Sequence, residues 1–277
     1  MPIRLVHAYR DDGPMSVLTK WKPRKVECTK TAEHSDIPGE MFVVKYASSK
    51  EGSACAISEL VCTQLLAGIG LRTLEPSIVR VSQGFAASCN FKSDFPYAIK
   101  EGDHYGTQLV TRVADGPPTA LDDLNDPWQL VLLWVADTWI GNIDRERQGN
   151  TLLSLASGGR FHLIAADQSD CFGGTSNFVD GQFSARFAKQ GKAPAPKPLV
   201  AAIAKSGGRS AVAEAVRRVR NATDQVSAAL SSVPAQWWRE SGISPGFVLS
   251  ALMARAEGLD SIIKPSEWEL SDGVLFL

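Results

Sequence analysis

The segment GNIDRERQGN, residues 141–150, is strongly polar although it directly follows an apolar stretch. Within it, Asp144 and Asn150 stand six positions apart. A carboxylate in such a loop can accept the proton of a hydroxyl group, and an asparagine carbonyl oxygen can ligate Mg²⁺, a hard cation that prefers oxygen ligands. Taken alone, the same segment is also compatible with a solvated turn between a helix and a hairpin.

Three other ionisable side chains have positions that suggest a shared site. Lys45 lies within the apolar segment MFVVKY, so its ammonium group either reaches solvent or points into a cleft. Glu59 lies in an expected helix and could reach Lys45, although a single helix glutamate is usually solvated. Asp167 ends the apolar run LIAA, where a carboxylate is costly unless it is paired or bound to a metal. Asp170 is a competing candidate for that role.

The order of these residues along the chain is that of a phosphoryl-transfer site. Such a site needs little covalent chemistry from the protein, but it must hold positive charge and a divalent metal against phosphate groups and orient an attacking hydroxyl. A lysine, a helix glutamate, an aspartate–asparagine loop and a strand-end aspartate supply these functions together. We therefore predict phosphoryl transfer from the combination, since no single residue is decisive.

The elements that must position these residues are read from periodicity and turn signals. The first third of the chain is rich in strand-forming residues and contains one amphipathic helix, whereas the part beyond Asp115 is mainly helical around one hairpin. We expect strands at 26–31, 41–46, 77–81, 108–113, 151–155 and 161–164, and helices at 53–67, 126–140, 199–205, 209–231, 234–239 and 244–259. Residues 172–198 are expected to form a loop.

This pattern predicts an α+β fold with the bilobal layout of a protein kinase. The N-lobe, residues 1–112, would be a small antiparallel sheet with one packed helix. The C-lobe, residues 113–277, would be helical and carry the polar loop and the metal-binding hairpin. This layout is an analogy at the level of the fold, so the function must be argued from the site.

Bulk composition sets the boundaries of the interpretation. The 277 residues are 44% hydrophobic, enough for a substantial core, and the net charge of −1 gives no field for binding nucleic acid or an anionic membrane. Neither a signal peptide nor an apolar run of membrane-spanning length is found, so we expect a cytoplasmic protein. The five scattered cysteines are expected to be reduced and mostly buried.

Two pairs of segments resemble one known family. WIGNIDRERQGNTLL followed by FHLIAADQSDCF resembles the catalytic and metal-binding segments of HipA-like kinases, a bacterial branch of the kinase-like fold that is also similar to phosphatidylinositol kinases. FVVKY and ISELVCTQLLAGIGL resemble the lysine strand and glutamate helix of that family. These segments span roughly residues 26–172.

The resemblance implies a role for each candidate residue, with ATP and Mg²⁺ as cofactors. It implies that Lys45 binds the ATP phosphates, that Glu59 pairs with Lys45 and that Asp144 is the catalytic base. Asn150 and Asp167 would hold Mg²⁺, and the backbone of Thr111 and Val113 would meet the adenine. Thr29 and Lys30, in the segment that would have to replace a glycine-rich loop, would cover the phosphates. Arg145 would either fix the loop, screen the transferred phosphoryl group or form a structural ion pair.

The sequence also departs from the protein-kinase pattern. Five residues, rather than four, separate Asp144 from Asn150, so either the loop bulges or another residue replaces Asn150. No glycine-rich loop precedes Lys45, and the segment 28–34 would have to cover the phosphates instead. Asp167 is followed by Gln-Ser in place of Phe-Gly. We expect a minimal single kinase module, without the extra N-terminal sequence of the two-domain toxins of that family.

Our leading hypothesis is an ATP- and Mg²⁺-dependent kinase that phosphorylates a serine or threonine hydroxyl, either of another protein or of itself. A second hypothesis is an inactive nucleotide-binding module that recruits a partner, and a third is a small-molecule or lipid kinase. We expect a protein substrate, a toxin–antitoxin-type protein partner, and no membrane or direct nucleic-acid binding. Less specific candidates are Lys189, Lys192 and Lys197 for a phosphorylated headgroup, Ser169, Ser176 and Ser184 for modification, and Trp237 and Trp238 for lobe packing or a partner.

Overall fold

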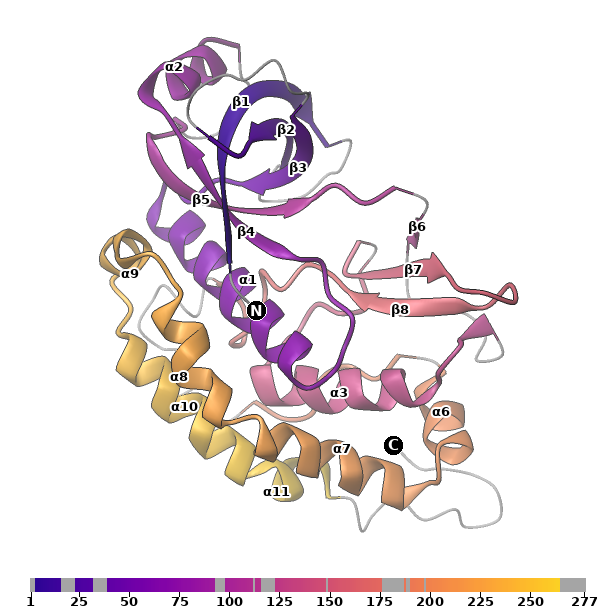
Figure 1. The fold of residues 1–277 in the computed structure, drawn as a ribbon. Helices are drawn as coiled ribbons and strands as arrows, with labels where there is room; N and C mark the ends of the chain where they lie inside the picture. The colour runs from indigo at the N-terminus through magenta and orange to yellow at the C-terminus, as the bar shows by residue number, and fades with distance from the viewer. Residues whose placement is uncertain are drawn as a thin grey trace.

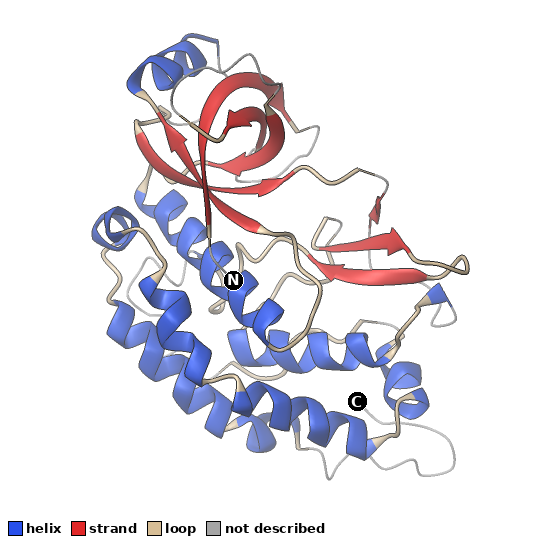
Figure 2. Cartoon of the chain, viewed as in Figure 1, coloured by secondary structure: helices blue, strands red, loops and turns tan. Residues whose placement is uncertain are grey.

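The first part of the chain forms a closed barrel of five strands in the order β1-β2-β3-β5-β4 (Figures 1 and 2). The computed structural model describes residues 3–15, 23–31, 39–92, 98–111, 113–115, 123–147, 149–175, 187, 190–196 and 198–264. The barrel strands are β1 (Arg4–Pro14), β2 (Arg24–Thr29), β3 (Glu40–Lys45), β4 (Pro76–Val81) and β5 (Gly102–Gln108).

Closure of the barrel depends on β1, which the sequence did not predict. β1 pairs antiparallel with β2 and parallel with β4, where Arg4 lies opposite Ser77. The expectation of a purely antiparallel sheet was therefore wrong. Only Val6 of β1 is buried, so this strand lacks the strong apolar pattern by which strands are recognised.

The inside of the barrel has its own apolar core. Val6, Val26, Phe42 and Val79 contribute to it, and helix α2 (Gln83–Lys92) adds Phe85, Ala86 and Cys89. Because these residues come from both the strands and α2, the helix closes the barrel core at one end. The sequence did not predict α2.

The last strand of the barrel is also displaced from its predicted position. The strand expected at 108–113 is instead β5, which ends at Gln108, and residues 109–111 have no regular structure. β5 has the sequence GDHYGTQ and buries polar residues, including His104 and Thr107. A reading based on apolar runs overlooks such a strand, because hydrogen-bonded polar side chains fill inward positions.

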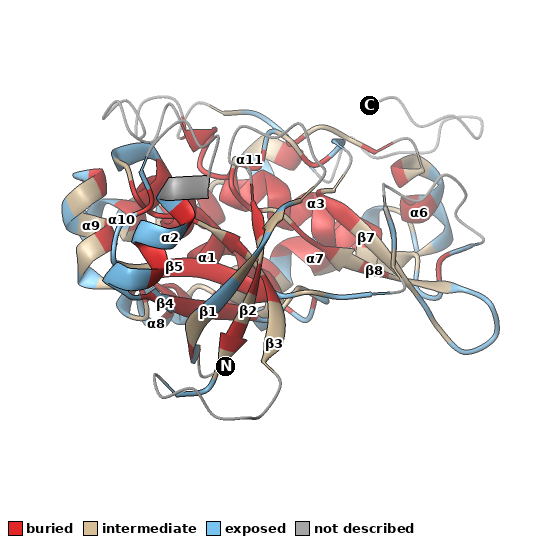
Figure 3. Cartoon of the chain, turned by 90° about the horizontal axis from the view of Figure 1, so that it is seen from above, coloured by how far each residue is buried: buried red, intermediate tan, exposed pale blue. Residues whose placement is uncertain are grey.

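Helix α1 (Lys50–Gly68) lies between the barrel and the helices of the second half of the chain. It begins at Ser49, whose side chain accepts a hydrogen bond from the Gly52 N–H. α1 is buried along most of its length (Figure 3), because it packs on β4 and β5 and also on α8 and α9. The helix predicted at 53–67 is thus confirmed and is slightly longer at both ends.

The rest of the described chain is helical apart from a second, three-stranded sheet in the order β6-β7-β8. The helix predicted at 209–231 was wrong as a single element, because the chain turns at Ala222 and Thr223 and forms two helices. The helix expected to end at 259 is also followed by a separate short one. These elements are β6 (Val113–Asp115), α3 (Trp128–Ile140), β7 (Thr151–Leu155), β8 (Phe161–Ala165), α6 (Leu199–Lys205), α7 (Arg209–Asn221), α8 (Asp224–Ser231), α9 (Ala235–Ser241), α10 (Pro245–Glu257) and α11 (Leu259–Ile263).

The architecture is therefore α+β. Most of the apolar side chains of α1, α3 and the later helices share one large core, separate from the core of the barrel. All five cysteines are buried and free of disulfides, as expected. Among the described residues, no helix combines the length and apolar character needed to cross a bilayer.

Candidate active site

Lys45 lies at the end of β3 and joins two carboxylates from distant parts of the chain. Its Nζ donates to Oε1 of Glu59 on α1. The same Nζ lies 2.7 Å from Oδ1 of Asp167, the second residue after β8. The Lys45 side chain is only 11% exposed, so it points into the molecule and not to solvent. The structure thus brings together three of the residues selected from the sequence.

The three charges shift one another's pKa. Burial opposes the charge of Lys45, but Asp167 and Glu59 outweigh it and hold the pKa of Lys45 well above its usual value. Burial also disfavours the Asp167 carboxylate, yet Lys45 and the Ser169 hydroxyl hold its pKa below the usual range. Burial raises the pKa of Glu59 to about 7, against the influence of Lys45. One lysine therefore faces two carboxylates, and a further cation would stabilise the group.

The backbone around Asp167 is fixed in an uncommon conformation. Asp167 has a φ of +46°, in the left-handed region that non-glycine residues rarely occupy. Its Oδ1 accepts hydrogen bonds from the N–H of Ser169, at 3.1 Å, and from the Ser169 hydroxyl, at 2.6 Å. This local turn orients the carboxylate. Ser169 is only 5% exposed, and its hydroxyl is bonded to Asp167, so it is not accessible for modification in this structure.

The polar loop begins where α3 ends at Gly141, which has a φ of +65°. The side-chain oxygen of Asn142 accepts the Asp144 N–H at 2.9 Å, and Arg147 Nε lies 2.8 Å from Asp144 Oδ1. Burial raises the pKa of Asp144, and the nearby charges of Asp167 and Asp170 raise it further, whereas Arg147 lowers it. The charges of Asp144, Asp167 and Asp170 are thus near enough to influence one another.

Asn150 is held against the start of the same loop. Its Nδ2 donates to the backbone oxygen of Asp144 and lies 3.3 Å from Asp144 Oδ2. The additional residue in this loop is accommodated by a turn from Asp144 to Arg147 and by Gly149, which has a φ of +93°. The loop turns at these positions, and Asn150 directly precedes β7.

Asn150 and Asp167 lie at the same end of the β7–β8 hairpin. Thr151 pairs with Ala165, and the Ala166 N–H donates to the Asn150 carbonyl at 3.1 Å. The Lys45 and Ser169 bonds all reach Oδ1 of Asp167, and the Asn150 amide bonds use Nδ2. The contacts among the described residues thus leave Oδ2 of Asp167 and Oδ1 of Asn150 as possible metal ligands. This oxygen pair suits Mg²⁺, which takes few protein ligands and completes its shell with phosphate and water oxygens.

Among the residues that the structure describes, no group of three His, Cys, Asp or Glu side chains is arranged to hold a metal ion. A cation at this site would therefore be held by Asn150, Asp167 and the oxygens of bound phosphate or water.

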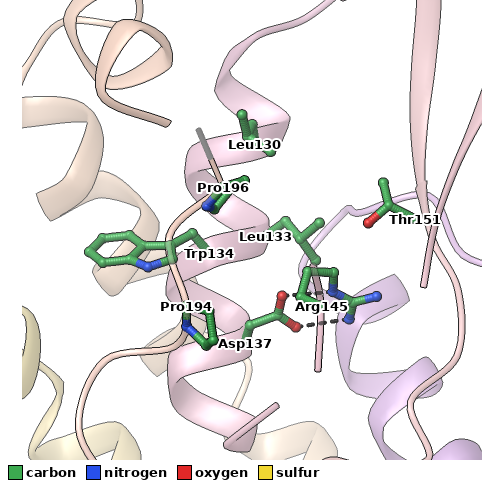
Figure 4. Close-up of a pocket in the computed structure, with 8 residues that line it drawn as sticks. All are labelled: Leu130, Leu133, Trp134, Asp137, Arg145, Thr151, Pro194 and Pro196. Carbon is green, nitrogen blue, oxygen red and sulfur yellow. Dashed lines mark hydrogen bonds and ion pairs between the residues drawn. The ribbon is translucent and has the colours of Figure 1, made fainter. Parts of the chain in front are cut away.

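Arg145 anchors the loop from inside the protein. Its guanidinium forms two bonds of 2.8 and 2.9 Å with the Asp137 carboxylate (Figure 4), and it donates to the backbone oxygens of Asn150 and Ala166. A fifth bond, of 2.7 Å, reaches Oε1 of Gln168. All five N–H groups of Arg145 are thus satisfied. Of the roles considered from the sequence, the structure shows the structural ion pair, and the bonds to Asn150 and Ala166 also fix the loop.

A small pocket lies beside this ion pair, on the side of α3 that faces β7 and the segment before α6 (Figure 4). Its lining is mainly apolar, and the Asp137 and Arg145 pair forms its polar wall. The lining residues are Leu130, Leu133, Trp134, Asp137, Arg145, Thr151, Pro194 and Pro196.

The remaining predicted residues lie at the edges of the site. Lys30 is exposed after β2, and Thr29 donates from its hydroxyl to the Thr31 carbonyl at 2.7 Å. Thr111 is exposed in the connection between β5 and β6, and Val113 begins β6 opposite Ser154. No described contact joins these four residues to the Lys45 cluster.

Several weaker candidates lie elsewhere or outside the described residues. Asp170 Oδ1 is turned toward Thr175, with 3.4 Å to the Thr175 N–H, whereas Asp167 makes the contact with Lys45. Trp237 is fully buried and donates to the Asp103 carbonyl at 2.7 Å, so it packs between elements, and Trp238 packs against the same core. Lys192 is exposed. Ser176, Ser184, Lys189, Lys197 and residues 32–34 of the expected phosphate-covering segment lie outside the described residues.

Sequence reasoning missed Asp137 and Gln168. Asp137 is the only charged residue in α3, whose sequence is WQLVLLWVADTWI, and a lone acid in so apolar a helix signals a buried partner. Gln168 carries no comparable signal, because its importance depends on contacts with distant segments.

The profile of HipA-like kinases matches residues 33–179, just over half of the chain. Among solved structures, the chain is similar to the Helicobacter pylori proinflammatory kinase CtkA, with 12% identity, a TM-score of 0.48 and coverage of 86% of this chain and 90% of that one. It is also similar to Shewanella oneidensis HipA, which was solved with HipB and operator DNA. The identity is 11%, the TM-score is 0.45, and the match covers 92% of this chain and 68% of the HipA chain. A search of curated proteins gave no match. On the strength of the profile match, this chain belongs to the HipA-like kinase family.

Proposed function

We propose that this chain is a kinase that transfers the γ-phosphoryl group of ATP to a serine or threonine hydroxyl of a protein, with Mg²⁺ as its metal. The observation that supports it most is Lys45, which contacts both Glu59 and Asp167 beside the Asp144–Asn150 loop. This arrangement can hold an amine and a metal against the same phosphates, next to a carboxylate that can accept a proton.

In this proposal each side chain has one task. Lys45, held by Glu59, binds the α- and β-phosphates, and Asn150 and Asp167 hold Mg²⁺, which neutralises charge on the phosphates when bound. Asp144 orients the acceptor hydroxyl and accepts its proton. Thr29 and Lys30 cover the phosphates, and the backbone at Thr111 and Val113 meets the adenine.

The proposed division of the molecule follows from these tasks. Residues 1–112 form a nucleotide-binding lobe, and residues 113–277 form a lobe that carries the loop and the hairpin. The acceptor is either another cytoplasmic protein or the chain itself. Family membership is the reason to test a toxin–antitoxin-type protein as a partner.

The test is transfer of radiolabelled phosphate from ATP to the chain itself and to a generic acceptor such as casein. Asp144→Ala should lower incorporation at least a hundredfold, which is the usual contribution of a general base. Asp167→Asn should abolish metal-dependent transfer, whereas Asp170→Asn, three residues away and turned toward Thr175, should retain most of it. Equal incorporation by the wild type and Asp144→Ala would exclude Asp144 as the base.

The same samples separate a kinase from an inactive binding module. A hundredfold excess of ATP over its Kd should stabilise either one by about 2.7 kcal/mol. Stabilisation without transfer to any acceptor would favour the module that recruits a partner, the alternative that the longer loop and the missing glycine-rich segment suggest.

A further inference from the structure

Gln168 occupies the interior of the site, directly after Asp167. It is fully buried, and both its peptide group and its side chain are hydrogen-bonded. A buried amide is costly unless its polar atoms are satisfied. Its contacts extend in two directions, to α1 and to the polar loop.

Toward α1, Gln168 uses its backbone. Its N–H donates to Oε2 of Glu59 at 2.9 Å, and its carbonyl accepts the Ser58 hydroxyl at 2.7 Å. Glu59 therefore holds Lys45 with one carboxylate oxygen and Gln168 with the other. Any displacement of Gln168 must disturb the carboxylate that positions Lys45.

Toward the loop, Gln168 uses its side chain. Oε1 accepts from Arg145 Nη2 at 2.7 Å and lies 3.4 Å from Asn142 Nδ2, while Nε2 lies 3.3 Å from the Ala166 carbonyl. Arg145 in turn holds the carbonyl of Asn150, and Asn142 holds the N–H of Asp144. One amide side chain thus reaches the groups that fix both ends of the loop.

We propose that Gln168 is a positioning residue that couples the Lys45–Glu59 pair to the metal-holding Asn150–Asp167 pair, so that binding of nucleotide and binding of metal strengthen each other. This proposal rests on the proposed function. Its physical basis is that the contacts on both sides of Gln168 are buried and include bonds of 2.9 Å to Glu59 and 2.7 Å to Arg145, so that neither pair can shift independently. Gln168 touches no reacting atom and acts only through Glu59 and Arg145.

The test is Gln168→Met, which keeps the length of the side chain and the backbone bonds but removes the carbonyl that Arg145 requires. ATP affinity is measured by calorimetry in EDTA and in excess Mg²⁺. We expect the gain in affinity from Mg²⁺ to fall about tenfold, as for loss of one buried bond to a charged group. Affinity in EDTA should stay within about twofold, because the Lys45–Glu59 contact remains.

A matched control is Gln64→Met on α1. Gln64 donates to the Leu60 carbonyl at 3.1 Å and to the Ser232 hydroxyl at 2.8 Å, away from the site. The same substitution there should leave the Mg²⁺ gain unchanged. Ser58→Ala removes a different bond to Gln168 and should reduce the gain in the same direction, so it tests the proposal even if Gln168→Met fails to fold.

The coupling is overturned if a folded Gln168→Met chain, or Ser58→Ala, keeps the full Mg²⁺ gain of the wild type. The outcome is distinct from failure of the proposed function, in which Asp144→Ala would transfer phosphate as well as the wild type. If the ATP affinity of the wild-type chain were the same in EDTA and in excess Mg²⁺, both the coupling and the proposed function would be overturned.

Discussion

Two buried charge clusters lie side by side at this site, and they differ in balance. Asp137 and Arg145 form an equal pair in which every guanidinium N–H has an acceptor, so this cluster needs no further ligand. Lys45 instead faces both Glu59 and Asp167. The balanced cluster can fix the loop, whereas the unbalanced one can respond to a cation. The contrast favours a structural role for the first cluster and agrees with the binding role that we propose for the second.

At this scale we predict the effect of neutralising Asp137. Asp137→Asn keeps the size of the side chain but leaves the Arg145 charge buried and uncompensated, so the free energy of unfolding should fall by about 3 kcal/mol. Urea denaturation at neutral pH measures it. The control is Glu214→Gln, which breaks an exposed pair with Arg217 and should leave the urea midpoint in place. Equal midpoints for all three chains would show that the buried pair does not support the fold.

The elements around the site were recognised to different degrees. The apolar, strongly patterned ones were predicted closely: α6 and β7 have the predicted bounds, and β8 and α3 differ by one or two residues at their ends. β1 and β5 were missed because their outward or hydrogen-bonded polar residues disguise the strand pattern. Both missed strands lie in the barrel, whereas other errors concern where the helices expected at 209–231 and 244–259 are divided.

The end of α3 gives a prediction at the scale of the element. Gly141 has a φ of +65°, and a Cβ there would lie 2.4 Å from the Phe187 ring. Gly141→Ala should lower the free energy of unfolding by about 3 kcal/mol, since the strain of the left-handed backbone and the overpacking add. Gly149→Ala, with a φ of +93° and open space around its Cβ, isolates the strain and should cost only about 1 kcal/mol.

Chemical denaturation of the two glycine variants measures how much more stability is lost at Gly141 than at Gly149. Similar losses at Gly141 and Gly149 would mean that Phe187 yields easily and that the exit of α3 is not held by packing. A larger loss at Gly141 would establish this helix end as the fixed origin of the polar loop.

At the scale of the whole molecule, the inside of the barrel has its own core, and the barrel joins the helical body both through Ile78 and Tyr105, which belong to the helical core, and through polar contacts. Within the barrel, Nδ1 of His104 on β5 accepts a hydrogen bond of 2.9 Å from the Ala47 N–H. Its Nε2 lies 2.9 Å from the Lys100 carbonyl oxygen. His104 must be neutral to accept, and burial lowers its pKa to about 4. Trp237 on α9 reaches the neighbouring Asp103 carbonyl, so the histidine lies where the helices meet the barrel.

Stability should depend on pH through His104. Because its folded-state pKa is below the ordinary value of 6.5, its contribution is complete above pH 6.5 and is lost as the pH falls toward 4, by about 3 kcal/mol at most. Glu59 acts in the opposite sense, because its raised pKa favours the fold at lower pH. The comparison of wild type with His104→Gln removes that opposing effect.

The measurement is the urea midpoint of both chains at pH 7 and pH 4.5. His104→Gln should be less stable than the wild type at pH 7 and should lose less on acidification. Parallel pH dependence in the two chains would show that His104 is not the titrating group.

The sequence by itself determined which residues to examine, because Lys45, Glu59, Asp144, Asn150 and Asp167 follow a local pattern and order that can be read without coordinates. It also predicted the α+β class and the main helices, whose apolar periodicity reflects burial directly. Only the tertiary structure decided the rest. Lys45 meets Asp167 across 122 positions, and Gln168 acquires its importance from partners in α1 and the loop. Hydrogen bonds between distant segments leave no periodic trace in a sequence, since their geometry exists only after the chain has folded.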